Sequence, residues 1–251
     1  MPRKIVATGR GGTGKSTFVA LISRYLKPPL FLIDLDPDLS LADMLGVDIH
    51  SEGKKTVSEV LYDVIEDRQR GQGPQVSVNE RLESLIWSYC LHEDVGFDLI
   101  ILGTKEHEGC YCFPDHLLKK TIPGLAKNYT HIIIDSPAGL EHLNRKIVSD
   151  IDDLFVILDP SEKSMRHIGK VRDITEAVGI HYNNFYLVAN YMFDEEAEKY
   201  LQLKGENYVG KIAYDPNVEE YNLKGISLLD LPEDSPACLS VLNLLTGAKL
   251  V

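Results

Sequence analysis

The nine residues Gly9–Thr17, GRGGTGKST, decide how the rest of the sequence is interpreted. They fit the phosphate-binding pattern G-x-x-x-x-G-K-[ST] at every fixed position. An apolar run, Lys4–Thr8, precedes them, and a helical pattern, Lys15–Leu26, follows them. A loop between a strand and a helix directs backbone N–H groups and the positive helix N-terminus toward phosphate oxygens. The stretch therefore predicts a nucleotide phosphate site, a P-loop.

The residues of this loop have separable expected roles. Lys15 is expected to reach the β- and γ-phosphates of ATP, and the Ser16 hydroxyl is expected to bind Mg²⁺. The other residues expected to contact the nucleotide are Gly11, Gly12, Thr13, Gly14 and Thr17. The alternative is a glycine-rich turn without a ligand, which the complete motif and its strand–loop–helix context disfavour.

Short apolar runs alternate with helical patterns along the whole chain. The predicted strands are Lys4–Thr8, Leu30–Asp34, Asp98–Gly103, His131–Asp135, Leu154–Leu158, Phe185–Ala189 and Tyr208–Ala213. They are apolar throughout rather than alternating, as expected when helices cover both faces of a sheet. We therefore predict an α/β fold with a mainly parallel sheet flanked by helices, in a single domain that spans residues 1–251.

The helical patterns are of unequal strength. Besides Lys15–Leu26, helices are predicted at Asn79–Tyr89, Asp115–Lys127, Leu140–Ser149, Ser164–Val178, Glu195–Leu203 and Ala237–Leu245. Between Leu39 and Gly73 the pattern is irregular, with weak helical periodicity in Val57–Ile65. The acidic run that starts at Asp194 is expected to cap a helix and to face water.

Two predicted strands end in aspartates. Asp34, Asp36 and Asp38 follow the second strand in DLDPD, and Asp135 ends the fourth. Ligands of open parallel sheets bind at the carboxyl ends of strands. We expect Asp135 to hold Mg²⁺ and Asp36 to orient the attacking water. Asp34 and Asp38 are equally well explained as turn formers or helix caps around the intervening proline.

Composition limits the classes of partner. The chain has 38 acidic and 26 basic residues and a formal net charge of −12, without a Lys/Arg cluster of the kind that binds nucleic acid. No apolar run reaches the roughly 20 residues that span a bilayer, and the N-terminus lacks a signal-peptide pattern. The sequence thus predicts a cytoplasmic protein without nucleic-acid or membrane partners. Four cysteines are too few for a disulfide-stapled fold of this length.

On these motifs the sequence resembles the MinD/ParA/NifH group of deviant P-loop ATPases over essentially its whole length. The supporting residues are GRGGTGKST, DLDPD as a first switch and DSPAGLEH as a second. The resemblance implies a homodimer with ATP at the interface, and it places an adenine-reading residue at Asn190. It also implies a lysine in the second loop position that contacts the partner's phosphates. Arg10 stands there instead; it keeps the charge but changes the reach.

One branch of that group is indicated by GCYCFP, which contains Cys110 and Cys112. This stretch resembles the Cys-x-Cys of CooC-type, nickel-handling maturation factors of carbon monoxide dehydrogenase. The resemblance implies such a client enzyme. We expect ATP turnover to be slow and switch-like, because the change of state matters more than the amount of ATP consumed. Two thiolates from each subunit of a symmetric dimer would form a four-sulfur site suited to zinc, an iron–sulfur cluster or nickel. On its own, a Cys-x-Cys pair is also compatible with two free thiols.

Other functions remain open at this point. A MinD- or ParA-like spatial regulator would share every nucleotide residue named above, and a NifH-like reductase component would use an interfacial iron–sulfur cluster. His92, His107 and His116 flank the cysteine pair, but surface or capping roles are commoner for histidines. Cys90 and Cys238 are expected to be core thiols.

Overall fold

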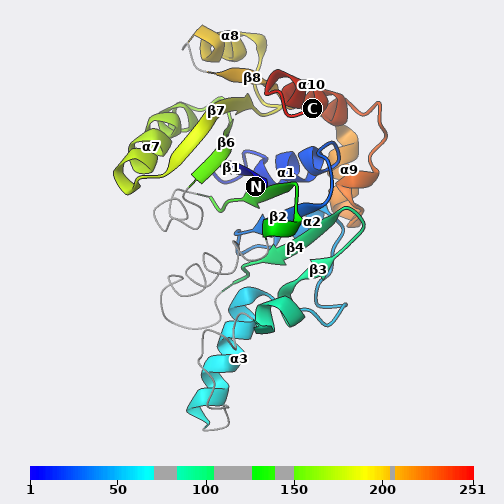
Figure 1. The fold of residues 1–251 in the computed structure, drawn as a ribbon. Coiled ribbons are helices and arrows are strands. Elements are labelled where there is room, and N and C mark those ends of the chain that lie inside the picture. The colour runs from blue at the N-terminus through cyan, green and yellow to red at the C-terminus, as the bar shows by residue number, and fades with distance from the viewer. Residues whose placement is uncertain (71–83, 105–125, 139–149, 204–206) are drawn as a thin grey trace.

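The chain folds around one sheet with helices on both faces (Figure 1). The computed structural model describes residues 1–70, 84–104, 126–138, 150–203 and 207–251. Within these residues the spatial order of the strands is β3-β4-β2-β5-β1-β6-β7-β8, and only the β3–β4 pair is antiparallel. The strands are β1 (Arg3–Gly9), β2 (Leu30–Asp34), β3 (His92–Glu93), β4 (Phe97–Ile101), β5 (His131–Asp135), β6 (Asp150–Leu158), β7 (His181–Ala189) and β8 (Tyr208–Lys211).

Most of the described helices lie in connections between strands, as a parallel sheet requires, whereas α9, η3 and α10 follow the last strand, β8. The α-helices are α1 (Lys15–Ser23), α2 (Ser40–Met44), α3 (Val57–Gln69), α7 (Glu162–Val178), α8 (Glu195–Leu203), α9 (Pro216–Lys224) and α10 (Pro236–Gly247). The shorter helices are η1 (Ile86–Cys90), η2 (Ala126–Asn128) and η3 (Leu228–Asp230). The predicted fold class and all seven predicted strands are confirmed.

Alternate residues of each central strand belong to different cores. Ile5 and Ala7 of β1 pack into a cluster with α1 and α10, whereas Val6 between them packs into the cluster with α3 and α7. Because successive side chains of a strand point to opposite faces, a strand buried on both faces must be apolar at every position. This is the physical reason for the continuous apolar runs.

Several elements differ from the sequence predictions. The irregular stretch after the second strand contains α2, and the weak pattern from Val57 extends as α3 to Gln69. β3 and α9 were not predicted: β3 has only two residues, and α9 buries none of its side chains. Neither element offers the apolar periodicity on which the prediction relied. The helix predicted at Asn79–Tyr89 is described only in its last part, which is the π-helix η1.

Some minor predictions can now be judged. Cys90 and Cys238 are buried, as predicted for core thiols. Asp194 caps α8 by accepting a hydrogen bond from the backbone N–H of Ala197 at 2.8 Å. The surface role expected for His92 is wrong, because its ring is buried and its Nδ1 lies 2.7 Å from a carboxylate oxygen of Glu52. The helices predicted at Asp115–Lys127 and Leu140–Ser149 lie largely or wholly outside the described residues.

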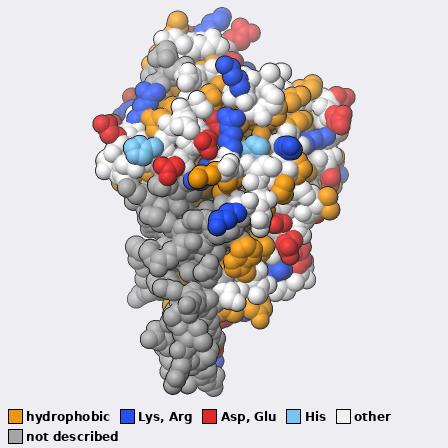
Figure 2. Space-filling view, in the orientation of Figure 1, with side chains coloured by type: hydrophobic (Ala, Val, Ile, Leu, Met, Phe, Trp, Pro, Cys, Tyr) orange, Lys and Arg blue, Asp and Glu red, His pale blue; other side chains and the backbone are white. Residues whose placement is uncertain are grey.

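The surface carries mixed charges. On the face shown in Figure 2, basic and acidic side chains are interspersed with hydrophobic ones. None of the helices in the described ranges is long and apolar enough to cross a membrane.

The packing at Gly103 generates a stability prediction. Gly103 has φ +76°, and a Cβ there would lie 2.4 Å from the Cβ of Thr56. We expect Gly103→Ala to lower the free energy of unfolding by about 2–4 kcal/mol, from backbone strain and overpacking together. Gly53 has φ +71° with nothing within 4 Å of an added Cβ, so Gly53→Ala is the matched control for backbone strain alone. We expect it to cost about 1 kcal/mol in denaturant unfolding; equal losses in the two variants would contradict the packing argument.

Candidate nucleotide-binding site

The P-loop begins where β1 leaves the sheet. Gly9 is the last residue of β1 and pairs in register with Ile157 of the neighbouring β6. An added Cβ at Gly9 would lie 2.4 Å from the carbonyl oxygen of Ile157 and 2.9 Å from Oγ1 of Thr13. Gly12 and Gly14 have positive φ angles of 74° and 92°. Glycine at these positions lets the backbone turn tightly enough to enter α1 directly.

Side chains of the loop fold inward onto its own backbone. The Thr13 hydroxyl donates a hydrogen bond to the carbonyl oxygen of Arg10 at 2.9 Å, and the Lys15 ammonium donates to the same oxygen at 3.2 Å. Lys15 and Ser16 are 5% and 7% exposed. Gly14 is the N-cap of α1 and supplies no side-chain hydrogen bond there. The N–H groups at the start of α1 thus face the site without competition from a capping side chain.

Asp135 lies beside these residues and is fully buried. Neither of its carboxylate oxygens has a hydrogen-bond partner in the described part of the chain. Burial raises the pKa of Asp135 to about 7; the Ser16 hydroxyl and Lys15 ammonium oppose the shift, and Asp36 adds to it. An unpartnered carboxylate next to a serine hydroxyl is an oxygen donor set that suits Mg²⁺. The residues present therefore fit the ion that the P-loop implies.

The aspartates after β2 have different roles. Asp34 is fully buried and accepts hydrogen bonds from the backbone N–H groups of Asp36, at 2.9 Å, and Leu41, at 3.1 Å. It therefore shapes the loop into α2, as the turn-former alternative predicted. Burial raises its pKa well above the usual value, and so does Asp135, its register partner on β5. Asp36 is half-buried near Asp135, and Asp38 is exposed. The water-orienting role of Asp36 stays a prediction.

A pocket beside Thr13, Gly14 and Thr17 continues the site away from Asp135. Asn190, which follows β7, lines it together with Tyr191 and Tyr214. The Oδ1 of Asn190 accepts from the backbone N–H of Met192 at 3.1 Å, whereas its buried Nδ2 has no partner among the described residues. The rings of Tyr191 and Tyr214 have centroids 5.6 Å apart. A free amide donor beside aromatic rings suits a nucleotide base, but base reading by Asn190 stays a prediction.

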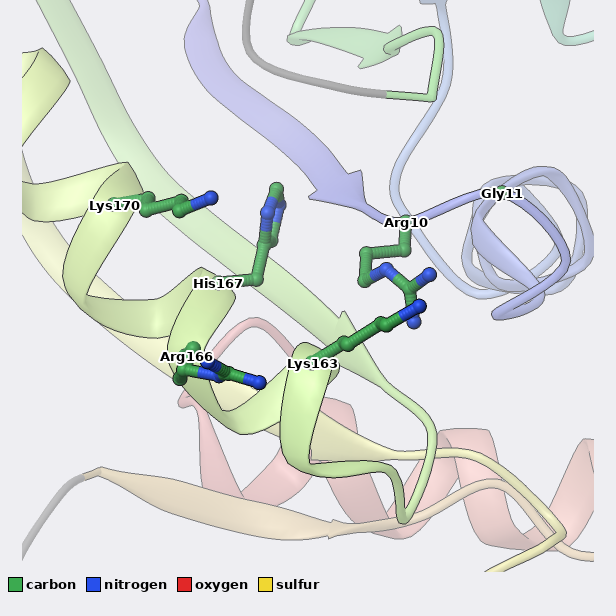
Figure 3. A pocket seen from close by; sticks show the side chains of 6 residues that line it. All are labelled: Arg10, Gly11, Lys163, Arg166, His167 and Lys170. Carbon is green, nitrogen blue, oxygen red and sulfur yellow. The ribbon is translucent and has the colours of Figure 1, made fainter.

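The Arg10 side chain points toward Lys163 of α7 (Figure 3). Its Nη1 lies 3.3 Å from the Ser161 hydroxyl and 3.6 Å from Oδ2 of Asp159, both in the connection from β6 to α7. Gly11 lines the same pocket as Arg10. The cross-subunit role of Arg10 stays a prediction. Sequence reasoning missed the α7 side chains around it, although their spacing places them on one helix face.

Cys110 and Cys112 lie outside the described residues, as do His107 and His116. In the ranges that are described, no group of three or more His, Cys, Asp and Glu side chains is arranged to hold a metal ion. The predicted Cys-x-Cys metal site therefore stays a prediction from the sequence.

Comparison with known proteins now identifies the family. A family profile described as an AAA domain matches residues 3–186, about three quarters of the chain. The chain belongs to the AAA domain family. Over 238 residues it is 32% identical to an uncharacterized ATP-binding protein of Methanocaldococcus jannaschii, covering 92% of each chain. Over 259 residues it is 27% identical to the carbon monoxide dehydrogenase accessory protein CooC of Rhodospirillum rubrum, covering 98% of this chain and 96% of that one.

Solved structures show the same fold. A plasmid partition protein of Borrelia burgdorferi bound to AMPPNP matches this AAA domain chain with a TM-score of 0.70 at 17% identity, over 99% of each chain. The MinD cell division protein of Aquifex aeolicus matches with a TM-score of 0.65 at 22% identity, over 99% of this chain and 96% of that one. The resemblance to MinD/ParA-type ATPases and to CooC is confirmed, and the chain is a P-loop ATPase.

The buried Asp135 generates a pH prediction for the nucleotide-free protein. Because its pKa is raised on folding, its contribution to stability is complete below the unfolded pKa of about 4 and is lost as the pH rises through about 7. We expect Asp135→Asn to raise the free energy of unfolding at pH 8 by about 1–3 kcal/mol relative to its effect at pH 4. Urea unfolding at the two pH values measures this. A pH-independent effect of Asp135→Asn would contradict the raised pKa.

Proposed function

We propose that this chain hydrolyses ATP slowly and acts as a homodimeric metallochaperone, with a transition metal as its cargo. The hydrolytic part of the proposal is supported by one observation above all: the unpartnered carboxylate of Asp135 lies beside Ser16 and Lys15 at the end of the P-loop. The metal-handling part is supported by the Cys-x-Cys pair of the sequence and by the similarity to CooC over nearly the whole of both chains.

In this proposal the P-loop binds and orients the triphosphate. Backbone N–H groups from Gly11 to Thr17 surround the phosphates, and the Lys15 ammonium moves from the Arg10 carbonyl to the β- and γ-phosphate oxygens. Ser16 and Asp135 would hold Mg²⁺, which supplies positive charge that stabilises the leaving phosphate oxygens. Asp36 orients the attacking water, and Asn190 donates its free amide N–H to the base. Because turnover would be slow and switch-like, the functional result of ATP hydrolysis would be a change in the nucleotide state of the protein rather than the consumption of ATP.

The dimer connects the two activities. Arg10 from one subunit would contact phosphates held by the other, so nucleotide binding would close the interface. Cys110 and Cys112 from both subunits would then surround one metal ion, with nickel favoured by the CooC resemblance and zinc as the alternative. Because both ligands favour the closed dimer, each would increase the affinity for the other by the same factor. A client metalloenzyme such as carbon monoxide dehydrogenase would receive the metal when hydrolysis reopens the dimer.

The MinD/ParA-like alternative is supported by a shared fold at low sequence identity and by a ParA family protein of Chlamydia psittaci that is 24% identical over 246 residues. ATP-dependent co-sedimentation of the protein with DNA or liposomes would contradict the metallochaperone proposal.

Substitutions in the site provide the first test of hydrolysis. We expect Lys15→Ala and Asp36→Ala each to lower ATP turnover about 100-fold or more, because one removes charge from the transferred phosphoryl group and the other the orienting carboxylate. Phosphate release measured with Mg-ATP under steady-state conditions gives the rates. Asp38→Ala is the matched control, since it removes an exposed carboxylate two residues away and keeps the backbone N–H that bonds to Asp36. Wild-type turnover in Lys15→Ala would overturn the assignment.

Metal analysis tests the second activity. We expect the purified wild-type protein to bind one nickel or zinc ion per dimer, and Cys110→Ala/Cys112→Ala to lose both the metal and the metal-stabilised dimer. Elemental analysis and mass measurement in solution, with and without a non-hydrolysable ATP analogue, provide the readouts. Cys90→Ala is the control, because burial raises the pKa of the Cys90 thiol to about 12 and keeps it protonated. Unchanged metal content in the double variant, or a monomer under every condition, would contradict the proposal.

A further inference from the structure

A second pocket adjoins the P-loop at Arg10 and Gly11, on the side of α7 (Figure 3). Its volume of about 520 Å³ lies within the range of about 300–1,000 Å³ that is common for small-molecule sites. Four residues of α7 line it at the spacing i, i+3, i+4 and i+7, which places them on one helix face: Lys163, Arg166, His167 and Lys170. We call these four residues the α7 basic stripe. Apart from Gly11, every lining residue is basic.

His167 is the buried member of the stripe. Its side chain is only 6% exposed, and its Nε2 has no hydrogen-bond partner among the described residues. Figure 3 shows its ring between Lys170 and Arg10. Burial lowers the pKa of His167, and Arg10, Lys170 and Lys15 lower it further. A buried polar atom without a partner is rare in folded proteins and needs an explanation, and the residue that carries it lines the pocket.

The charges around the pocket are only partly compensated. Arg10 lies 3.6 Å from Asp159, and Arg166 lies 3.4 Å from Glu162. In the described ranges, no carboxylate lies within ion-pair distance of either Lys163 or Lys170. Two ammonium groups therefore line the pocket without a carboxylate partner among the described residues. The two arginines beside them are paired with carboxylates that do not line the pocket. Lys163, Arg166 and Lys170 are exposed, so water and salt screen part of their repulsion, and an anion in the pocket would offset the rest.

We propose that this pocket binds a phosphate dianion separately from the phosphates that the P-loop binds. A phosphate group carries a charge of about −1.5 to −2 near pH 7 and three acceptor oxygens, which matches two uncompensated ammonium groups. The guanidinium of Arg10 suits phosphate oxygens geometrically, and the His167 side chain lines the same pocket. A single carboxylate would leave one charge uncompensated. The carboxylates of an acidic peptide would spread along an extended chain, whereas these cations surround one hollow.

Two sources can supply this chemistry: free phosphate and the terminal phosphates of a second nucleotide. The pocket shares Gly11 with the P-loop, and we assign it to phosphate released there as product. That product role rests on the proposed ATP hydrolysis, whereas the binding site itself does not. Arg10 would then contact both the bound nucleotide and the departing phosphate, and the α7 basic stripe would influence the rate of product release.

The test is a titration of the wild-type protein with its P-loop filled by Mg²⁺ and a non-hydrolysable ATP analogue. Inorganic phosphate is added at constant ionic strength, and the ring signals of His167 are followed by NMR. We expect saturable binding in the wild type and a loss of affinity of about tenfold or more in Lys163→Gln/Lys170→Gln, which removes two charge-assisted contacts. Lys27→Gln/Lys199→Gln removes the same charge from exposed lysines outside the pocket lining and should leave the affinity within about twofold.

The other outcomes of the titration either support or overturn the proposed phosphate site. Stripe-dependent binding of phosphate identifies the free ion as the source, and tighter stripe-dependent binding of added ADP identifies a nucleotide phosphate; both support the site. Equal binding by the two double variants, or binding only while the P-loop is empty, overturns it. Binding of a ten-residue glutamate peptide but not of phosphate also overturns it, in favour of an acidic protein segment. The ATPase proposal is judged separately, because this titration does not measure turnover: stripe-dependent phosphate binding by a wild-type protein without ATPase activity would support the site and contradict the proposed hydrolysis.

Discussion

The close approach of Gly9 to the carbonyl of Ile157 is the constraint on which the site depends. β1 lies between β5 and β6, and its last register pair joins Gly9 to Ile157. Any side chain at this point would enter the neighbouring backbone, so only glycine allows β1 to continue into the loop without separating from β6. The same contact positions the loop between the ends of β5, β6 and β7. Asp135, Asp159 and Asn190 therefore surround one short stretch of backbone.

The polar groups near this loop are unusually poorly satisfied for buried atoms. The carboxylate of Asp135, the amide nitrogen of Asn190 and Nε2 of His167 all lack partners in the described part of the chain. A buried polar group left unpaired costs about 1–3 kcal/mol. The three groups differ in chemistry and in place. The carboxylate of Asp135 lies near Ser16, the amide of Asn190 lines the base pocket, and the imidazole of His167 lies among basic side chains. Each group matches a different part of a magnesium nucleotide or its phosphate product, so ligand binding would relieve the cost at each place.

Much of the fold and the centre of the site followed from local pattern, for identifiable reasons. Strands such as Leu30–Asp34 are buried on both faces, which demands apolar residues at every position and makes them visible without any knowledge of their neighbours. The P-loop was equally visible because its chemistry lies in nine consecutive residues. By contrast, α9 and the two-residue β3 contribute little to either core, so no apolar periodicity in the sequence predicted them. The sequence left open whether Asp34 forms a turn, because only the folded loop shows that its carboxylate accepts the backbone N–H groups.

By itself, the sequence determined the α/β class, the phosphate loop and the set of candidate residues, because these depend on contacts between near neighbours in the chain. The tertiary structure alone decided which distant groups meet. It paired Asp34 with Asp135 across adjacent strands, directed Arg10 toward Asp159 and Ser161, and placed the α7 basic stripe beside Gly11. Such contacts depend on the spatial order of the strands in the sheet. The order β2-β5-β1-β6 differs from the order of these strands along the chain, so the sequence alone does not give it.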